Sequence, residues 1–109
     1  MSAIVLNRDQ LPRFEHTFEF EGAQHQAEVS FIWVDMPPGD SVRLHKHAYQ
    51  EILIVQEGTA SYVIGSETLE AQAGQILVVP ADVPHAFRNS GEGRLRQIDI
   101  HVATVIKTQ

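Results

Sequence analysis

Two histidines and a glutamate near the middle of this 109-residue chain are residue types that bind metal ions. They are His45, His47 and Glu51, and all three have odd numbers. Side chains of an extended strand alternate between its two faces, so these residues share a face if one strand continues through the segment. Imidazole nitrogens and a carboxylate on one face predict part of a divalent-metal site that needs another ligand. The alternative is a group of polar side chains on a solvated sheet face.

Two stretches of the chain carry a recognisable spacing. The first runs G-D-S-V-R-L-H-K-H-A-Y-Q-E-I-L-I-V-Q-E-G, and it resembles the first cupin motif, G-(x5)-H-x-H-(x3-4)-E-(x6)-G, at every fixed position. The second runs G-Q-I-L-V-V-P-A-D-V-P-H-A-F-R-N and resembles the second cupin motif, G-(x5)-P-x-G-(x2)-H-(x3)-N. The matching positions are Gly39, His45, His47, Glu51 and Gly58 in the first stretch, and Gly74, Pro80, His85 and Asn89 in the second.

One position departs from the second motif, because Asp82 stands where the family has an inner glycine. This position lies in a turn, and Asp tolerates the left-handed backbone conformation better than most residues. We therefore expect the substitution to be compatible with the fold and to leave the metal site unaffected.

The chain is thus identified as resembling a small single-domain cupin of the cupin 2, conserved-barrel type. The resemblance implies an all-β fold, a cupin double-stranded β-helix or jelly-roll barrel with little or no helix. It also implies one divalent transition metal inside the barrel, with iron, manganese or nickel favoured and zinc or copper also compatible. Carried over to this sequence, the ligands are His45, His47, Glu51 and His85. Four protein ligands leave two positions of an octahedral shell open for water, substrate or dioxygen.

The pattern of the remaining sequence agrees with an all-β fold of one domain, residues 1–109. Short segments rich in β-branched and aromatic residues alternate with Gly and Pro turns, and no helical period continues over a dozen residues. We expect N-terminal strands within 1–36, with a dimer contact there, the two motifs within 39–89, and a closing strand over 94–105. The individual strands are predicted at 14–20, 28–36, 41–47, 52–56, 60–64, 67–71, 75–80, 85–89 and 95–105.

Composition excludes several classes of function. The net charge of −6 gives no basic surface for nucleic acid or anionic lipid. The absence of cysteine excludes disulfides, thiolate metal sites and cysteine nucleophiles. No apolar run reaches the roughly 18 residues of a membrane span, and the N-terminus does not resemble a signal peptide. We therefore expect a cytoplasmic protein without nucleic-acid or membrane partners.

Three further residues are candidates for a substrate pocket: Arg43, Phe87 and His101. Arg43 and Phe87 share the parity of the histidine in their own segment, so Arg43 either pairs with an anionic substrate or lies exposed on its strand. His101 lies on the strand face shared by Gln97 and Asp99, which is either open to water or part of a polar pocket near the metal. Glu51 and His101 are the candidate catalytic residues.

The sequence leaves the reaction open. A metal-dependent dioxygenase, or an isomerase, lyase or decarboxylase, would act on a small organic acid or a similar oxygen-rich molecule. The alternative is a module that binds or senses a sugar or an acid without turnover. The apolar Ile4–Leu6 segment and the alternating 14–20 segment predict a homodimer in which N-terminal edges are covered.

Overall fold

A computed structural model describes residues 2–109, and these residues form ten strands and two single-turn 3-10 helices. The helices are η1 (Arg8–Gln10) and η2 (Gly22–Gln24). Within residues 2–109 no helix has the length and apolar character needed to cross a membrane. The strands are β1 (Arg13–Phe14), β2 (Thr17–Phe20), β3 (Ser30–Met36), β4 (Ser41–His45), β5 (Glu51–Glu57), β6 (Thr59–Ile64), β7 (Glu67–Gln72), β8 (Ile76–Val79), β9 (His85–Asn89) and β10 (Leu95–His101).

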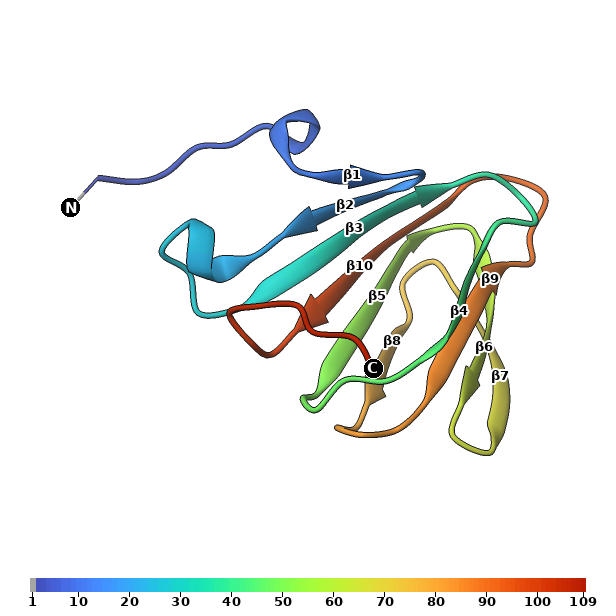
Figure 1. Ribbon diagram of the computed structural model, residues 1–109. Helices are drawn as coiled ribbons and strands as arrows, with labels where there is room; N and C mark the ends of the chain where they lie inside the picture. The colour runs from blue at the N-terminus through green and yellow to red at the C-terminus, as the bar shows by residue number, and fades with distance from the viewer. Residues whose placement is uncertain (1) are drawn as a thin grey trace.

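The strands form two antiparallel sheets that face each other (Figure 1). The larger sheet has the order β1-β2-β3-β10-β5-β8, and the smaller has the order β4-β9-β6-β7. Because β4 and β5 follow each other in sequence but lie in different sheets, the segment between them crosses from one sheet to the other. The all-β jelly-roll fold expected from the sequence is thus confirmed.

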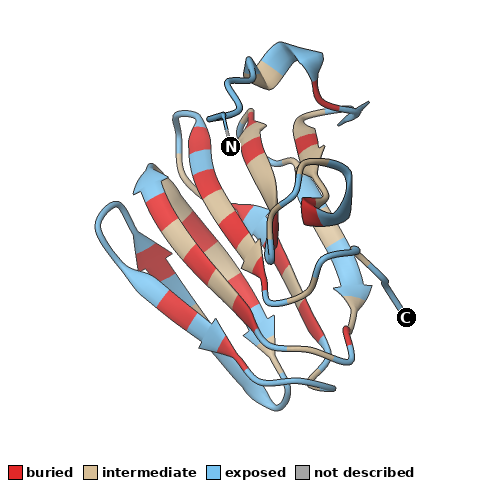
Figure 2. Ribbon diagram, turned by 90° about the vertical axis from the view of Figure 1, so that its left-hand side faces the viewer, coloured by how far each residue is buried: buried red, intermediate tan, exposed pale blue. Residues whose placement is uncertain are grey.

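The core lies between the sheets, where the central strands bury alternate residues (Figure 2). In β5, Leu53 and Val55 point inward, while Ile52 and Ile54 lie on the outer face. Burying one such side chain contributes about 1.5–3 kcal/mol to folding. This period of two fixes the register, because a slip by one residue would turn the apolar set outward.

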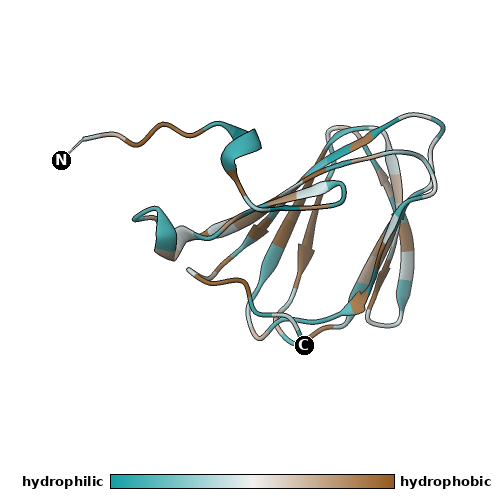
Figure 3. Cartoon of the chain, turned by 45° about the horizontal axis from the view of Figure 1, so that its top comes forward, coloured by the Kyte–Doolittle hydropathy of each residue, from teal (hydrophilic) through white to brown (hydrophobic). Residues whose placement is uncertain are grey.

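Two elements differ from the sequence prediction near the N-terminus. The segment predicted as one strand over 14–20 is a hairpin of β1 and β2, since Glu15 adopts a left-handed conformation with φ of 55° and reverses the chain. Thr17 Oγ1 donates a hydrogen bond of 2.9 Å to the Phe14 carbonyl and closes this turn. The apolar Ile4–Leu6 segment is not part of a strand and lies outside the two sheets in Figure 3, where Ile4 and Leu6 line a pocket with Phe31 and Trp33.

The last strand is shorter than predicted, because β10 ends at His101 and the predicted continuation to 105 leaves the sheet. We call residues 102–109 the C-terminal strap. Its first amide, on Val102, donates to the Gln50 carbonyl at 3.0 Å. At its end, Gln109 and Lys46 exchange two backbone hydrogen bonds of 3.0 and 2.8 Å. The strap therefore crosses the open end of the barrel beside the turn between β4 and β5.

The two motif turns have the backbone that their sequences require. Gly58 has a φ of 88°, and a Cβ there would lie 2.4 Å from the Arg94 carbonyl oxygen, so only glycine fits. Asp82 adopts a left-handed conformation with a φ of 64°, which confirms that it replaces the motif glycine without a change of fold. Its amide donates to the His47 carbonyl at 2.7 Å and ties the turn to the site.

Candidate metal centre

Three strand ends and one turn bring the four predicted metal ligands together. His45 is the last residue of β4, and it pairs with His85, the first residue of β9. Glu51 begins β5 in the opposite sheet, and His47 lies in the turn between them. The predicted strand 41–47 ends two residues early, at His45, so no single strand continues to Glu51 and the condition for a shared strand face is not met. The turn nevertheless returns the chain so that all three side chains converge.

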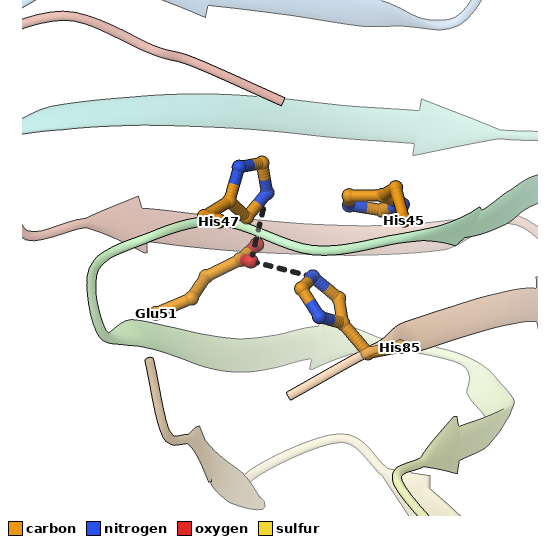
Figure 4. Close-up of side chains that lie close together, drawn as sticks. All are labelled: His45, His47, Glu51 and His85. Atoms are coloured by element: carbon orange, nitrogen blue, oxygen red, sulfur yellow. Dashed lines mark ion pairs between the residues drawn. The ribbon is translucent and has the colours of Figure 1, made fainter. Parts of the chain in front are cut away.

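The ligand atoms of His45, His47, Glu51 and His85 all lie within 4.8 Å of one another. Oε2 of Glu51 is 2.8 Å from Nε2 of His85 and 3.4 Å from Nε2 of His47 (Figure 4). Three of the residues are buried, and only His45 is partly exposed. The cluster therefore combines buried ligand atoms with one side that faces the cavity.

The buried atoms of this cluster fit a divalent cation. Nε2 of His47, Nε2 of His85 and Oε2 of Glu51 are buried, and apart from their contacts with one another they have no polar partner among residues 2–109. A buried polar atom without a partner costs about 1–3 kcal/mol, so three adjacent ones need an explanation. A cation between them would satisfy all three, and imidazole with carboxylate suits first-row metals.

The tautomers of the three cluster histidines are set by backbone carbonyl groups. A carbonyl oxygen only accepts, so each neutral ring carries its proton on Nδ1 and has a lone pair on Nε2. This is the form that binds a metal through Nε2. The Nδ1 contacts are 2.7 Å from His45 to Arg43 O, 2.7 Å from His47 to Lys107 O and 2.9 Å from His85 to Val83 O.

The electrostatics of the cluster keep Glu51 ionised. Burial alone would raise its pKa, but the imidazoles of His101 and His85 outweigh burial and lower the pKa to about 2. Burial lowers the pKa of His45 and of His47, so both favour the neutral form. Burial also acts to lower the pKa of His85, yet the Glu51 carboxylate reverses this and raises it. A cation that enters the cluster would therefore compete with a proton for Nε2 of His85.

A cavity of about 550 Å³ opens next to the cluster. Arg43 and Phe87, both predicted pocket residues, are in its lining together with His45, His47 and Glu51. Arg43 is exposed, whereas Phe87 is buried in the wall. Their contact with a substrate stays a prediction. The C-terminal strap adds Ile106, Thr108 and Gln109 to the lining, a contribution that the sequence analysis did not foresee.

His101, the third predicted pocket residue, lies behind the cluster and is only 1% exposed. Its Nε2 is 3.3 Å from Oε1 of Glu51, and its Nδ1 is 2.7 Å from the Tyr49 hydroxyl. Burial raises the pKa of Tyr49 to about 12, so this hydroxyl keeps its proton. The sequence analysis did not single out Tyr49, and the only signal for this polar contact was the alternation of Gln97, Asp99 and His101 in β10.

A second polar chain lies deeper in the barrel. The Tyr62 hydroxyl donates to Oε1 of Gln97, and Nε2 of Gln97 donates to Oδ1 of Asp99 at 2.7 Å. Asp99 also lines the cavity. Burial raises the pKa of Asp99 well above its usual value of 3.8, and the charge of Glu51 adds to the effect. Asp99 is therefore a carboxyl group that resists ionisation beside the cavity.

The sequence matches a known protein family along more than half of its length. The sequence model described as Cupin domain (Cupin_2) matches residues 32–101, which include both motifs and all of β10. This match confirms the resemblance found from the motif residues.

Two curated proteins are similar to parts of the chain. A polyketide synthase, CurC, from Streptomyces cyaneus is 36% identical over 64 residues, which are 58% of this chain and 42% of that protein. An uncharacterised protein of Streptomyces coelicolor is 37% identical over 46 residues, which are 42% of this chain and 44% of that protein. The chain thus spans less than half the length of these relatives.

Solved structures of oxalate decarboxylases share the fold. The Bacillus subtilis enzyme, described with Mn(II) centres, has a TM-score of 0.83 at 20% identity over 93% of this chain and 30% of that chain. The Lactobacillus farciminis enzyme, in complex with formate, has a TM-score of 0.83 at 20% identity over 93% of this chain and 33% of that chain. At this identity the likeness shows the fold alone.

The raised pKa of Asp99 predicts how stability depends on pH. The folded protein keeps this proton at pH values where the unfolded chain has released it, so Asp99 opposes folding increasingly as the pH rises above 3.8. Asp99→Asn retains the oxygen that accepts from Gln97 and cannot ionise. At pH 7 we expect the free energy of unfolding of the metal-free variant to exceed that of wild type by at least about 1 kcal/mol, which corresponds to roughly 4–8 °C in Tm. The difference should be smaller at pH 4.

Thermal unfolding of both proteins at the two pH values measures this difference. Glu92→Gln, at an exposed turn position, serves as the control and should show no such change with pH. An Asp99→Asn effect of equal size at pH 4 and pH 7 would contradict the prediction.

Proposed function

We propose that this chain, which belongs to the cupin domain family, binds one divalent transition metal and acts on a small organic acid or a similar oxygen-rich molecule. The ligands in this proposal are His45, His47, Glu51 and His85. The observation that carries it is their convergence, with three histidines in the tautomer that presents Nε2. A cluster of solvated side chains, the alternative considered from the sequence, has no reason to be buried or to share one tautomer.

A bound divalent cation would supply a Lewis acid that polarises a carbonyl or carboxylate oxygen and stabilises negative charge. His45 is the partly exposed member of the cluster, so a substrate would approach from its side. The two open coordination positions inferred from the ligand count would face the cavity there. Iron, manganese and nickel suit three imidazoles and one carboxylate, and zinc and copper are compatible. The Mn(II) centres of the Bacillus subtilis decarboxylase favour a test with manganese first.

The cavity wall is suited to a small molecule with both charged and apolar parts. Arg43 would pair with an anionic group near the entrance, since its side chain is exposed and lines the cavity. Asp99 would hold a proton at its carboxyl group and donate a hydrogen bond to a substrate oxygen. Phe87 and Val34 supply apolar contacts on the inner wall. About 550 Å³ suits a small molecule.

Loss of a single ligand should weaken metal binding. We expect His45→Ala and His85→Ala each to weaken Mn(II) binding by about 100-fold or more, because each change removes an imidazole nitrogen that would bind the ion. Isothermal titration and elemental analysis of purified protein measure the affinity and the occupancy. His25→Ala, outside the cluster, is the matched control and should bind like wild type. Full occupancy in both cluster variants would refute the ligand assignment.

Turnover distinguishes an enzyme from a binding module. Metal-loaded protein would be tested with small carboxylic acids, β-diketones and catechols for oxygen consumption, carbon dioxide release and isomerisation. We expect turnover to be lost in His85→Ala. Arg43→Ala should raise KM at least about 10-fold, since an anionic substrate would lose its charge partner. Tight binding without any product would instead support the non-catalytic sensing alternative.

We also propose a homodimer, formed through the outer face of the larger sheet instead of the N-terminal strands expected from the sequence. Paired residues of β10, β5 and β8 place six aliphatic side chains together on this face. We call them the outer apolar patch: Ile52, Ile54, Ile76, Val78, Ile98 and Ile100. The patch includes no charged residue, so two copies with a net charge of −6 each can meet there without burying like charges. Contiguous exposed apolar surface of this kind is typical of protein interfaces.

A charge in the patch should separate the subunits. Ile76 and Val78 are 64% and 55% exposed, so aspartate is tolerated there in the isolated chain. We expect wild type to have twice the mass of one chain in light scattering, and Ile76→Asp with Val78→Asp to have the mass of one chain. Val63→Asp, exposed on the smaller sheet, is the control. A monomeric wild type would contradict the proposal.

A further inference from the structure

The Tyr49 hydroxyl lies between two histidines and the C-terminal strap. Its oxygen is 2.7 Å from Nδ1 of His101 and 3.2 Å from Nδ1 of His47, and it accepts from the Lys107 amide at 3.2 Å. A tyrosine hydroxyl has one hydrogen to donate. The question is which histidine receives it.

His47 cannot receive this hydrogen, because its Nδ1 already carries a proton. That proton is donated to the Lys107 carbonyl oxygen, 2.7 Å away, and a carbonyl has no hydrogen to offer in return. The Tyr49 hydroxyl therefore donates to Nδ1 of His101, which is also the nearer nitrogen.

The tautomer of His101 follows, and it is opposite to that of the three cluster histidines. With Nδ1 accepting, a neutral His101 ring carries its proton on Nε2. This nitrogen is buried and has no hydrogen-bond partner among the described residues, and Oε1 of Glu51 lies 3.3 Å away as a close ion-pair contact. A protonated nitrogen offers no lone pair, so the ring acts as a donor to the carboxylate and not as a fifth ligand.

We propose that Tyr49 and His101 are positioning residues for Glu51. The Tyr49 hydroxyl donates to Nδ1 of His101, and Nε2–H of His101 donates to Oε1 of Glu51. Oε2 alone is then presented to the metal. This inference rests on the proposed metal site. Oε2 is the oxygen that faces His47 and His85, at 3.4 and 2.8 Å. The carboxylate would then bind an ion through one oxygen only.

The proposal predicts that the two residues tune metal binding without contacting the metal. The probe is Mn(II) alone, titrated into metal-free protein, with the electron paramagnetic resonance spectrum of the bound ion as a second readout. We expect Tyr49→Phe and His101→Leu each to weaken binding by about 10-fold to 100-fold and to alter the spectrum. His101→Gln retains an N–H donor near the position of Nε2, so binding should return to within about 3-fold of wild type.

Tyr62→Phe is the matched control, because it removes a buried tyrosine hydroxyl that bonds to Gln97 and touches no cluster residue. Its Mn(II) affinity and spectrum should equal those of wild type, and thermal unfolding would verify that every variant is folded. Wild-type affinity and spectrum in both Tyr49→Phe and His101→Leu would overturn the positioning role while leaving the metal site intact. A loss in His101→Gln as large as in His101→Leu would show that His101 is itself a ligand. Wild-type protein that binds no Mn(II), iron(II) or nickel would overturn the metal site and this proposal together.

Discussion

The Glu51 carboxylate is buried inside a small barrel, and the arrangement of the neighbouring strand ends follows from that burial. An isolated charge in a protein interior is costly unless it is paired and hydrogen-bonded. Glu51 is 3% exposed, and imidazoles of His47, His85 and His101 surround its two oxygens. These rings come from a turn, from the start of β9 and from the end of β10. The site therefore depends on strand ends from both sheets meeting at one end of the barrel.

Backbone carbonyl groups divide the four histidines into two kinds. His45, His47 and His85 each give their Nδ1 proton to a carbonyl oxygen, which leaves Nε2 free. His101 meets a hydroxyl group at the same position and so takes the other tautomer. Residues of one type in one cluster thus acquire different roles from their hydrogen-bond partners, a distinction that distance to the carboxylate would not reveal.

The sequence predicted the cluster better than it predicted the geometry behind it. Motif spacing identified His45, His47, Glu51 and His85, and a left-handed turn at Asp82, because these features depend on local sequence. The predicted strand 41–47 was two residues too long, because periodicity cannot locate the turn after His45. His45, His47 and Glu51 all have odd numbers, but it is the turn that brings their side chains together. The prediction of β10 to residue 105 failed for a similar reason, since apolar residues of the strap resemble a continuing strand.

The partners of Glu51 and His47 were beyond sequence reasoning. Tyr49 and His101 are 52 positions apart, and His47 and Lys107 are 60 positions apart. Such contacts arise only when the barrel closes, and the one to Lys107 uses a backbone oxygen that every residue type possesses. No pattern of side chains signals it. The polar alternation of Gln97, Asp99 and His101 showed that one face of β10 was unusual, yet it left open whether that face met water or a pocket.

The C-terminal strap supports His47 through its backbone and faces the cavity with side chains of Ile106, Thr108 and Gln109. These two tasks use different atoms of the same segment. Side chains there can change over evolutionary time while the carbonyl of residue 107 keeps its place beside the imidazole. Relatives built in this way could vary the cavity wall without loosening the imidazole of His47. The strap is accordingly the segment where a designer seeking a new specificity would begin.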